Sequence, residues 1–229
     1  MAKLYHFPLD PFSRRIRLAL GEYKADVELV EERSWERRDA FLALNPAGAP
    51  PVLIEEDGSA IAGVEALSEY LEETRGVKNG LTLFGETPLQ RAETRRLAAW
   101  FDVKFHREVS APLIREKIER RLAGRDRGTG MVNVNAIRVA LRNIREHLAY
   151  IGALSQARNW LAGDTLSHAD LAAAAHISCV DYLGDTPWSE NAAAKQWYQR
   201  IKSRPCFRPL LADRIRTMPP PRFYADLDF

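Results

Sequence analysis

Three prolines within the nine residues 45–53, NPAGAPPVL, constrain the fold of this chain most strongly. A residue that precedes a proline is disfavoured in helical conformation, so Asn45-Pro46 marks the end of a helix. Pro50 and Pro51 then lead into a strand, and neither has a backbone N–H. An X-Pro bond is also nearly the only peptide bond for which the cis form is accessible. The fold must therefore turn here without a hydrogen bond from either nitrogen.

Strands and helices alternate on both sides of this segment. Hydrophobic periodicity and turn residues predict one α/β domain over residues 1–77. The order strand-helix-strand, then strand-strand-helix, is typical of a thioredoxin-like domain. The first helix has an amphipathic pattern, with Arg14, Arg15 and Arg17 between apolar residues. The predicted strands cover residues 2–7, 27–30, 52–54 and 60–62, and the predicted helices cover residues 14–23, 35–44 and 64–73.

The rest of the chain has helical periodicity. Residues 78–87 form a predicted linker, and Thr87-Pro88 has the pattern of a helix cap followed by proline at the first helical position. Residues 88–216 form a predicted all-helical domain, with one glycine-rich loop at residues 123–131. Ser167 and Asp170 have the spacing of a capping box. Residues 217–229 form a separate tail.

Composition excludes several classes of function. The chain has 229 residues, 28% of them charged, with a net charge of +2, so nucleic acid is not an expected partner. No apolar stretch approaches the ~20 residues that cross a bilayer, and no signal peptide is evident, so we expect a cytoplasmic protein without membrane insertion. Cys179 and Cys206 form no metal or redox motif, and we expect no metal and no cofactor.

Four segments carry a resemblance to a known family. Their order and separations resemble those of the cytosolic glutathione transferase superfamily over nearly the whole chain. The resemblance implies a thioredoxin-like N-terminal domain, an all-α C-terminal domain and a cis bond before Pro51. The segments are residues 12–20, 45–53, 66–71 and 160–170.

The same resemblance locates the glutathione site, and every contact position departs from the family pattern. Asp10 occupies the position of the catalytic serine or cysteine, where an ionised carboxylate accepts hydrogen bonds only and raises the pKa of a nearby thiol. Pro50 stands where the family uses a backbone N–H. Gly63 and Val64 replace a Glu-Ser pair, and Val64 lacks the hydroxyl that binds the γ-glutamyl carboxylate. These changes predict a noncatalytic protein.

Two residues keep a catalytic alternative open. Ser13 lies one turn from Asp10 and is a candidate hydroxyl for an active glutathione S-transferase. Its simpler interpretation is a first-turn serine that is hydrogen-bonded locally. Tyr5 lies near the position of a catalytic tyrosine, although a strand residue of this kind more often packs in the interior.

Three surface features are candidates for partner binding. The tail after Pro221 combines aromatic residues with Asp226 and Asp228, and either docks a partner or folds back on its own domain. Trp35 lies among charged residues, either in an interface or packed under the second helix. Glu119 belongs to a charged helical face that either binds a partner or is only solvated.

A narrower resemblance gives these features a partner. Residues 5–6, 10–20, 31–38, 179–185 and 224–229 resemble those of a group of glutathione-transferase-like cell-division proteins of alphaproteobacteria. Members of that group bind FtsZ, the tubulin-like division polymer, and are homodimers. The resemblance implies an FtsZ-binding homodimer at the division site. The expected contact residues are Trp35, Glu119, Asp226, Asp228 and Phe229.

Overall fold

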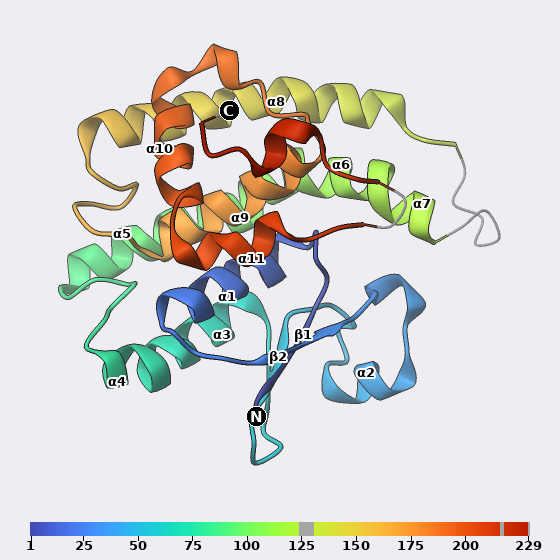
Figure 1. The fold of residues 1–229 in the computed structure, drawn as a ribbon, viewed down its shortest axis with the longest axis vertical. Helices are drawn as coiled ribbons and strands as arrows, with labels where there is room; N and C mark the ends of the chain where they lie inside the picture. Colours follow the sequence, from blue (N-terminus) through green and yellow to red (C-terminus); the bar gives the residue numbers. More distant parts are fainter. Residues whose placement is uncertain (124–130, 216–217, 229) are drawn as a thin grey trace.

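The computed structural model describes residues 1–123, 131–215 and 218–228 (Figure 1). An N-terminal α/β half lies below a larger helical half in this view, and the two chain ends lie at opposite ends of the molecule. The predicted fold class is confirmed. The loop expected at residues 123–131 falls almost wholly outside the described residues, and so does Phe229.

The N-terminal half is built on a mixed sheet with the strand order β2-β1-β3-β4. β1 pairs parallel with β2 and antiparallel with β3, and β4 completes the antiparallel edge. The Pro50–Pro51 bond is cis, as expected. The elements of this half are β1 (Lys3–His6), α1 (Pro11–Glu22), β2 (Glu28–Glu31), α2 (Asp39–Leu44), β3 (Val52–Ile54), β4 (Ala60–Ala62), α3 (Val64–Leu71) and α4 (Val77–Asn79).

The second half is a bundle around one central helix. Every residue of α9 is buried, its polar residues included, as expected for a helix that other elements surround. The long rod from α5 to α7 passes through a π-helical stretch, Trp100–Ser110. The helices are α5 (Pro88–Ala99), α6 (Ala111–Ile114), α7 (Arg120–Leu122), α8 (Val134–Ala157), α9 (His168–Tyr182), α10 (Ala192–Lys202) and α11 (Arg208–Leu211).

Both predicted caps are present. The Thr87 hydroxyl accepts from the Gln90 backbone N–H, and Pro88 is the first helical residue. At the start of α9, the Asp170 carboxylate accepts from the Ser167 N–H at 3.1 Å. It also accepts from the Leu161 N–H at 2.9 Å, which ties the preceding loop to the helix.

Some predicted boundaries were wrong. The helix expected at residues 35–44 is a single 3₁₀ turn, Ser34–Glu36, followed by α2, because Arg37 takes a left-handed conformation with φ of +48°. Helix does not continue to residue 216: residues 158–167, 183–187 and 212–215 are loops. Short helix α4 lies at the start of the expected linker.

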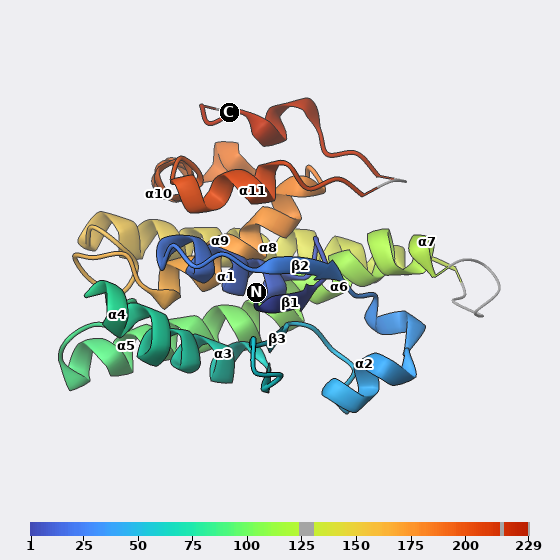
Figure 2. The ribbon, with the colours of Figure 1, turned by 60° about the horizontal axis from the view of Figure 1, so that its bottom comes forward.

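We also expected Arg14, Arg15 and Arg17 to form a polar face of α1. This expectation is wrong, because all three side chains are buried. This helix packs between the sheet half and α9, so its surface is covered on more than one side (Figure 2). Each guanidinium finds a carboxylate across the domain boundary. Arg15 pairs with Asp102, and Arg17 pairs with Asp213 at 2.8 Å. The arginines therefore join the two halves.

We expect Asp213→Ala to lower the free energy of unfolding by about 3–5 kcal/mol, because it leaves two buried guanidinium groups without their carboxylate. Urea denaturation followed by circular dichroism measures the change. Glu190→Ala is the matched control, since it breaks an ion pair with Arg145 whose side chains are 40–52% exposed. Its expected change is below about 1 kcal/mol. Equal effects of the two substitutions would contradict a structural role for the buried pair.

Candidate functional site

A cleft of about 240 Å³ lies between the two halves of the molecule. Asp10 and Phe12 line it from the start of α1, and Trp35 and Pro50 line it from the segments around α2. The helical rod adds His106, Ile114, Arg115 and Glu119. The structure therefore brings together four residues that the sequence singled out for different reasons: Asp10, Trp35, Pro50 and Glu119.

Asp10 caps α1. One of its carboxylate oxygens accepts from the Ser13 backbone N–H at 2.6 Å. Burial raises the pKa of Asp10 to about 7, and the nearby Glu119 contributes in the same direction. The expectation of a fully ionised carboxylate therefore holds only above that pH, and near neutrality both protonation states are populated.

The two alternative catalytic residues have structural roles. Ser13 is fully buried, and its hydroxyl accepts from the Phe7 backbone N–H at 3.3 Å. Tyr5 packs its ring against Phe41, with centroids 5.8 Å apart. Neither residue is among those that line the cleft in the described structure.

The remaining positions that the resemblance assigned to glutathione lie at the junction of β4 and α3. Gly63 precedes α3 with φ of +91°, a conformation that strains any residue with a side chain. No side chain caps the N-terminus of α3, and Val64 packs against the hydrophobic core. Among the described residues that line the cleft, neither Gly63 nor Val64 is present.

Trp35 and Glu119 line the same cleft and come from the two different halves of the molecule. The Trp35 ring is half-buried and makes an edge contact with Phe7, with centroids 5.0 Å apart. Burial raises the pKa of Glu119, and the neighbouring Arg115 opposes this shift. The Glu119 carboxylate makes no hydrogen bond or ion pair with the described part of the chain. Both residues are accessible from the cleft, and their partner-binding role stays a prediction.

The tail folds back on the helical half, as one of the two interpretations of the sequence anticipated. Tyr224 is fully buried, and its hydroxyl accepts from Arg14 at 3.1 Å and donates to the Leu210 carbonyl at 3.2 Å. The Tyr224 ring lies 5.2 Å from the Tyr182 ring. Beyond this anchor, Asp226 and Asp228 are exposed. Phe229, the last predicted contact residue, lies outside the described residues.

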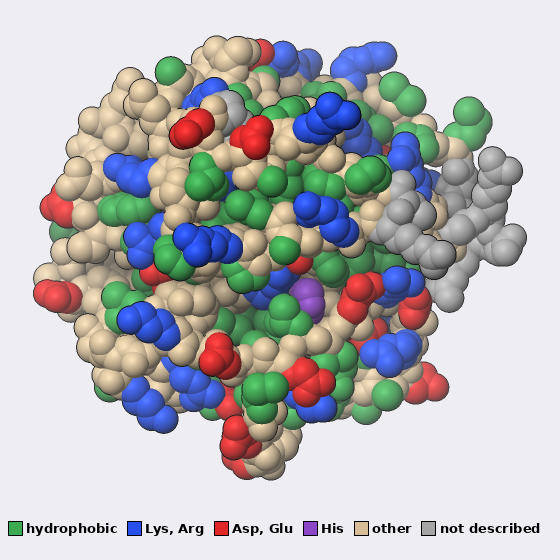
Figure 3. Space-filling model, viewed as in Figure 1, with side chains coloured by type: hydrophobic (Ala, Val, Ile, Leu, Met, Phe, Trp, Pro, Cys, Tyr) green, Lys and Arg blue, Asp and Glu red, His purple; other side chains and the backbone are tan. Residues whose placement is uncertain are grey.

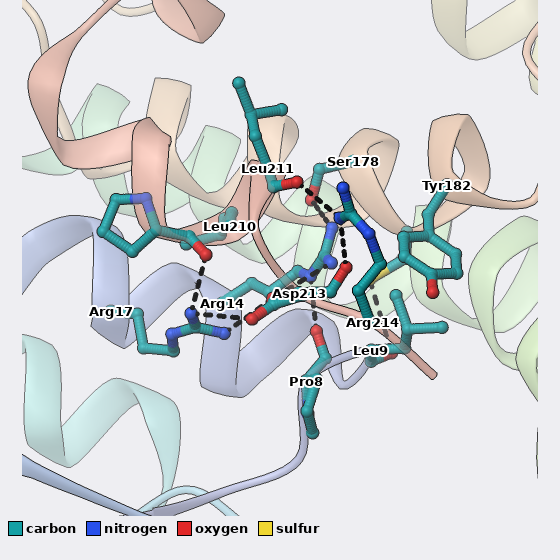
Figure 4. A network of polar contacts seen from close by, with 12 residues as sticks. Pro8, Leu9, Arg14, Arg17, Ser178, Tyr182, Leu210, Leu211, Asp213 and Arg214 are labelled. Atoms are coloured by element: carbon teal, nitrogen blue, oxygen red, sulfur yellow. Dashed lines mark hydrogen bonds and ion pairs between the residues drawn. The ribbon is translucent and has the colours of Figure 1, made fainter. Parts of the chain in front are cut away.

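Arg14 is the buried residue whose structural role sequence reasoning missed. Figure 4 shows its guanidinium between the Pro8 carbonyl, Ser178 and Asp213, with Arg17 on the other side of the carboxylate. Three arginines within four positions of a helix that also carries buried leucines were the available signal. The position of the tail depends on this buried charge.

The tail and the cleft share one hydrophobic cluster. Tyr224 and Tyr182 pack together with Phe7 and Ile114, and Trp35 packs against the same group. Contacts of the tail therefore reach the residues that form the cleft walls. On the face seen in Figure 3, acidic and basic side chains are interspersed.

The described residues contain no cluster of histidine, cysteine or acidic side chains that could hold a metal ion. Both cysteines are buried and free. Within the described ranges, none of the helices has the length and apolar character needed to cross a bilayer.

The fold defines a glutathione-transferase-like protein, and comparison with known families agrees. Residues 4–79 match the glutathione S-transferase N-terminal domain, and residues 134–205 match the glutathione S-transferase C-terminal domain. The chain belongs to the glutathione S-transferase family.

One relative and two solved structures are similar over nearly the full length. The chain is 48% identical over 229 residues to FtsZ-localized protein A of Caulobacter vibrioides, with 99% of this chain and 97% of that protein covered. The solved structure of FzlA from C. crescentus has a TM-score of 0.93 and 47% identity, covering 100% of this chain and 99% of the other. A structure described as a glutathione S-transferase of Sinorhizobium meliloti has a TM-score of 0.96 and 50% identity, with both chains covered completely.

Asp10 provides a test of the electrostatics of the cleft. Because its folded pKa of about 7 lies above its ordinary value, the stability of the protein falls as pH rises from about 4 to 7. Asp10→Asn keeps a good cap but cannot ionise. The stability of the variant relative to the parent protein should therefore increase between about pH 4 and pH 7 and stay constant above pH 7, as measured by urea denaturation. A constant difference would show that Asp10 ionises with its ordinary pKa.

Proposed function

We propose that this protein is a noncatalytic, homodimeric adaptor with the glutathione S-transferase fold, which binds FtsZ filaments in the bacterial cytoplasm at the division site. The observation that carries this proposal is the 48% identity over essentially the whole chain to a protein named for its localisation with FtsZ. The similarity includes the tail, and the matched structure of FzlA covers the chain completely.

The chemistry of the cleft supports the noncatalytic part of the proposal. Pro50 has no N–H for the cysteinyl unit of glutathione. Asp10 gains a donor proton only below a pH of about 7, whereas a glutathione thiolate forms at higher pH, near the ordinary thiol pKa of about 8.5. The two conditions oppose each other. Ser13 is fully buried and is not among the residues that line the cleft in the described structure.

The structure of the tail supports the proposed binding to FtsZ. Its anchor at Tyr224 holds Asp226 and Asp228 on the surface, and Leu227 between them is 41% exposed. A docked segment loses less conformational entropy on binding than a free one. We assign the tail residues and Phe229 to one contact region, and Trp35 and Glu119 to a second region at the cleft.

A homodimer suits a polymeric partner. Two identical contact surfaces on one dimer engage two subunits of a filament, and the second contact forms at a high effective concentration. The net charge of +2 and the mixed surface charges argue against nucleic acid as the partner.

Charge reversal at Asp226 and Asp228 tests the tail. We expect Asp226→Lys with Asp228→Lys to reduce co-sedimentation with FtsZ polymers at least about tenfold, since rim charges that face a partner control association. The fold should remain intact because both side chains are exposed. Glu56→Lys is the control, an exposed charge reversal at the tip between β3 and β4. Unchanged co-sedimentation of the double variant would remove the tail from the contact region.

The anchor is tested separately with a conservative change. Tyr224→Phe removes only the hydroxyl that Arg14 and Leu210 contact. We expect a loss of about 1–3 kcal/mol in stability, because the buried Arg14 donor loses an acceptor, and weaker FtsZ binding because the tail is less ordered. Truncation after Ala225 keeps the anchor and removes only the exposed end. If Tyr224→Phe lowers stability but leaves FtsZ binding unchanged, the anchor has no role in presenting the tail.

An active glutathione S-transferase is the second candidate function. The observation in its favour is the 50% identity to a structure described as such an enzyme. Calorimetric titration with glutathione separates the two candidates. We expect no binding at millimolar concentrations, and measurable affinity together with transfer to an electrophile would overturn the noncatalytic proposal.

A further inference from the structure

A chain of hydrogen bonds runs through the helical half and ends at the cleft. The Asp102 carboxylate, paired with Arg15, lies 3.2 Å from His176 Nε2. His176 Nδ1 lies 2.9 Å from the Ser110 hydroxyl, which in turn lies 3.1 Å from His106 Nδ1. His106 is one of the residues that line the cleft.

The middle of this chain contains the residue types of a hydrolytic triad, but its serine is inaccessible. Ser110 is fully buried, and its oxygen lies between two imidazole rings. A nucleophile must reach its substrate, so this serine is excluded from that role. The series of hydrogen bonds from Asp102 to His106 instead fixes which nitrogen of each ring carries a proton.

The position of each proton follows from the charge of Asp102, the carboxylate at the far end of this series of hydrogen bonds. Burial works against the charge of Asp102, but the Arg15 guanidinium and the hydrogen-bonded His176 ring together outweigh it and hold the pKa of Asp102 below its ordinary value. Burial lowers the pKa of His176, so this ring is neutral and donates from Nε2 to the carboxylate. Its Nδ1 then accepts from the Ser110 hydroxyl.

The same logic continues to the cleft. The Ser110 hydroxyl donates a hydrogen bond to His176 Nδ1, and its oxygen accepts a hydrogen bond from His106 Nδ1–H. Burial lowers the pKa of His106 to about 4, so the ring is neutral near pH 7. Its Nε2 carries a lone pair and makes no hydrogen bond with the described residues. The hydrogen bond from His106 Nδ1 to Ser110 thus keeps His106 Nε2 as an acceptor.

The other polar groups of the cleft are also mostly acceptors. The Glu119 carboxylate has no hydrogen-bond donor among the described residues, and Asp10 uses one oxygen for its cap. Arg115 is the single cation among the described residues that line the cleft; its side chain is exposed. Trp35 contributes an aromatic wall, which favours a cation over an anion.

We propose that the cleft binds an alkylated guanidinium or ammonium group, whose N–H donors meet His106 Nε2 and the carboxylates of Glu119 and Asp10 beside Trp35. The cleft of about 240 Å³ is smaller than a typical drug-sized pocket and suits a group the size of one side chain. The source is either a free small amine or an arginine or lysine of a protein. This protein binds the cation by itself, and the binding does not depend on FtsZ.

Titration with butylguanidinium tests the class of ligand, and neutral butylurea is the matched control with the same shape. Calorimetry at pH 8 should show millimolar affinity for butylguanidinium and none for butylurea. Glu119→Gln should weaken the binding at least about fivefold, because the neutral amide loses the charge-assisted contact. No binding, equal binding of butylurea, or full affinity in Glu119→Gln would overturn the proposal.

The pH dependence gives a second measurement. Of the titratable groups around the cleft, burial holds the pKa of His106 at about 4 and raises that of Cys179 behind Asp10 to about 12. Asp10 titrates near pH 7, and the pKa of Glu119 is raised. Affinity for butylguanidinium should therefore be about tenfold higher at pH 8 than at pH 6. A flat profile would contradict a contact with these carboxylates.

The proton assignment is tested by NMR. Long-range ¹H–¹⁵N spectra should show the neutral Nδ1–H tautomer of His106 in the parent protein. Ser110→Ala should abolish this preference and weaken butylguanidinium binding, whereas Ser110→Thr, which restores the hydroxyl, should rescue both. An Nε2–H tautomer in the parent protein would refute the assignment.

A second ligand distinguishes a free small amine from a protein side chain as the source of the cation. N-acetylarginine methylamide carries the same guanidinium on a peptide backbone. Tighter binding than that of butylguanidinium identifies a protein side chain as the natural occupant, and weaker binding identifies a free amine. Failure of both ligands overturns the inference while leaving FtsZ co-sedimentation to be judged on its own result.

Discussion

The buried guanidinium of Arg14 is the interaction on which the rest of the structure depends. A buried charge is tolerated only when it is paired and its donors are satisfied. Arg14 meets this condition with Asp213, the Pro8 carbonyl, Ser178 and Tyr224. These partners come from the loop before α1, from α9, from the segment after α11 and from the tail. One side chain thus requires distant parts of the chain to meet.

This requirement explains why the tail is ordered. Phe223 and Leu227 of the tail remain 40–41% exposed, so these apolar side chains do little to hold it in place. Tyr224 supplies both a buried ring and an acceptor for Arg14, and Tyr182 secures the approach through Met218 and Ile215. Because Phe7 and Ile114 belong to the same cluster, the tail and the cleft are parts of one packed region. A change at either one affects the other through shared contacts.

Much of the architecture was predictable because its signals are local. The cis bond before Pro51, the caps at Thr87 and Ser167, and the strand order depend on a few adjacent residues and on a resemblance in spacing. The roles of Arg15, Asp102 and His176 were not predictable in this way. Asp102, His106 and Ser110 recur at every fourth position of one rod, which was a usable signal, but His176 and Arg15 come from other helices.

The sequence by itself determined the fold class, and it determined that position 50 has no backbone N–H and position 64 no hydroxyl, since proline and valine lack those groups in any conformation. Only the tertiary structure decided the state of the groups that remain. Burial moves the pKa of Asp10 to about 7, a distant carboxylate orients the proton of His106, and Arg14 holds the tail in place. Each of these depends on solvent exclusion and on neighbours remote in sequence, which no local pattern records.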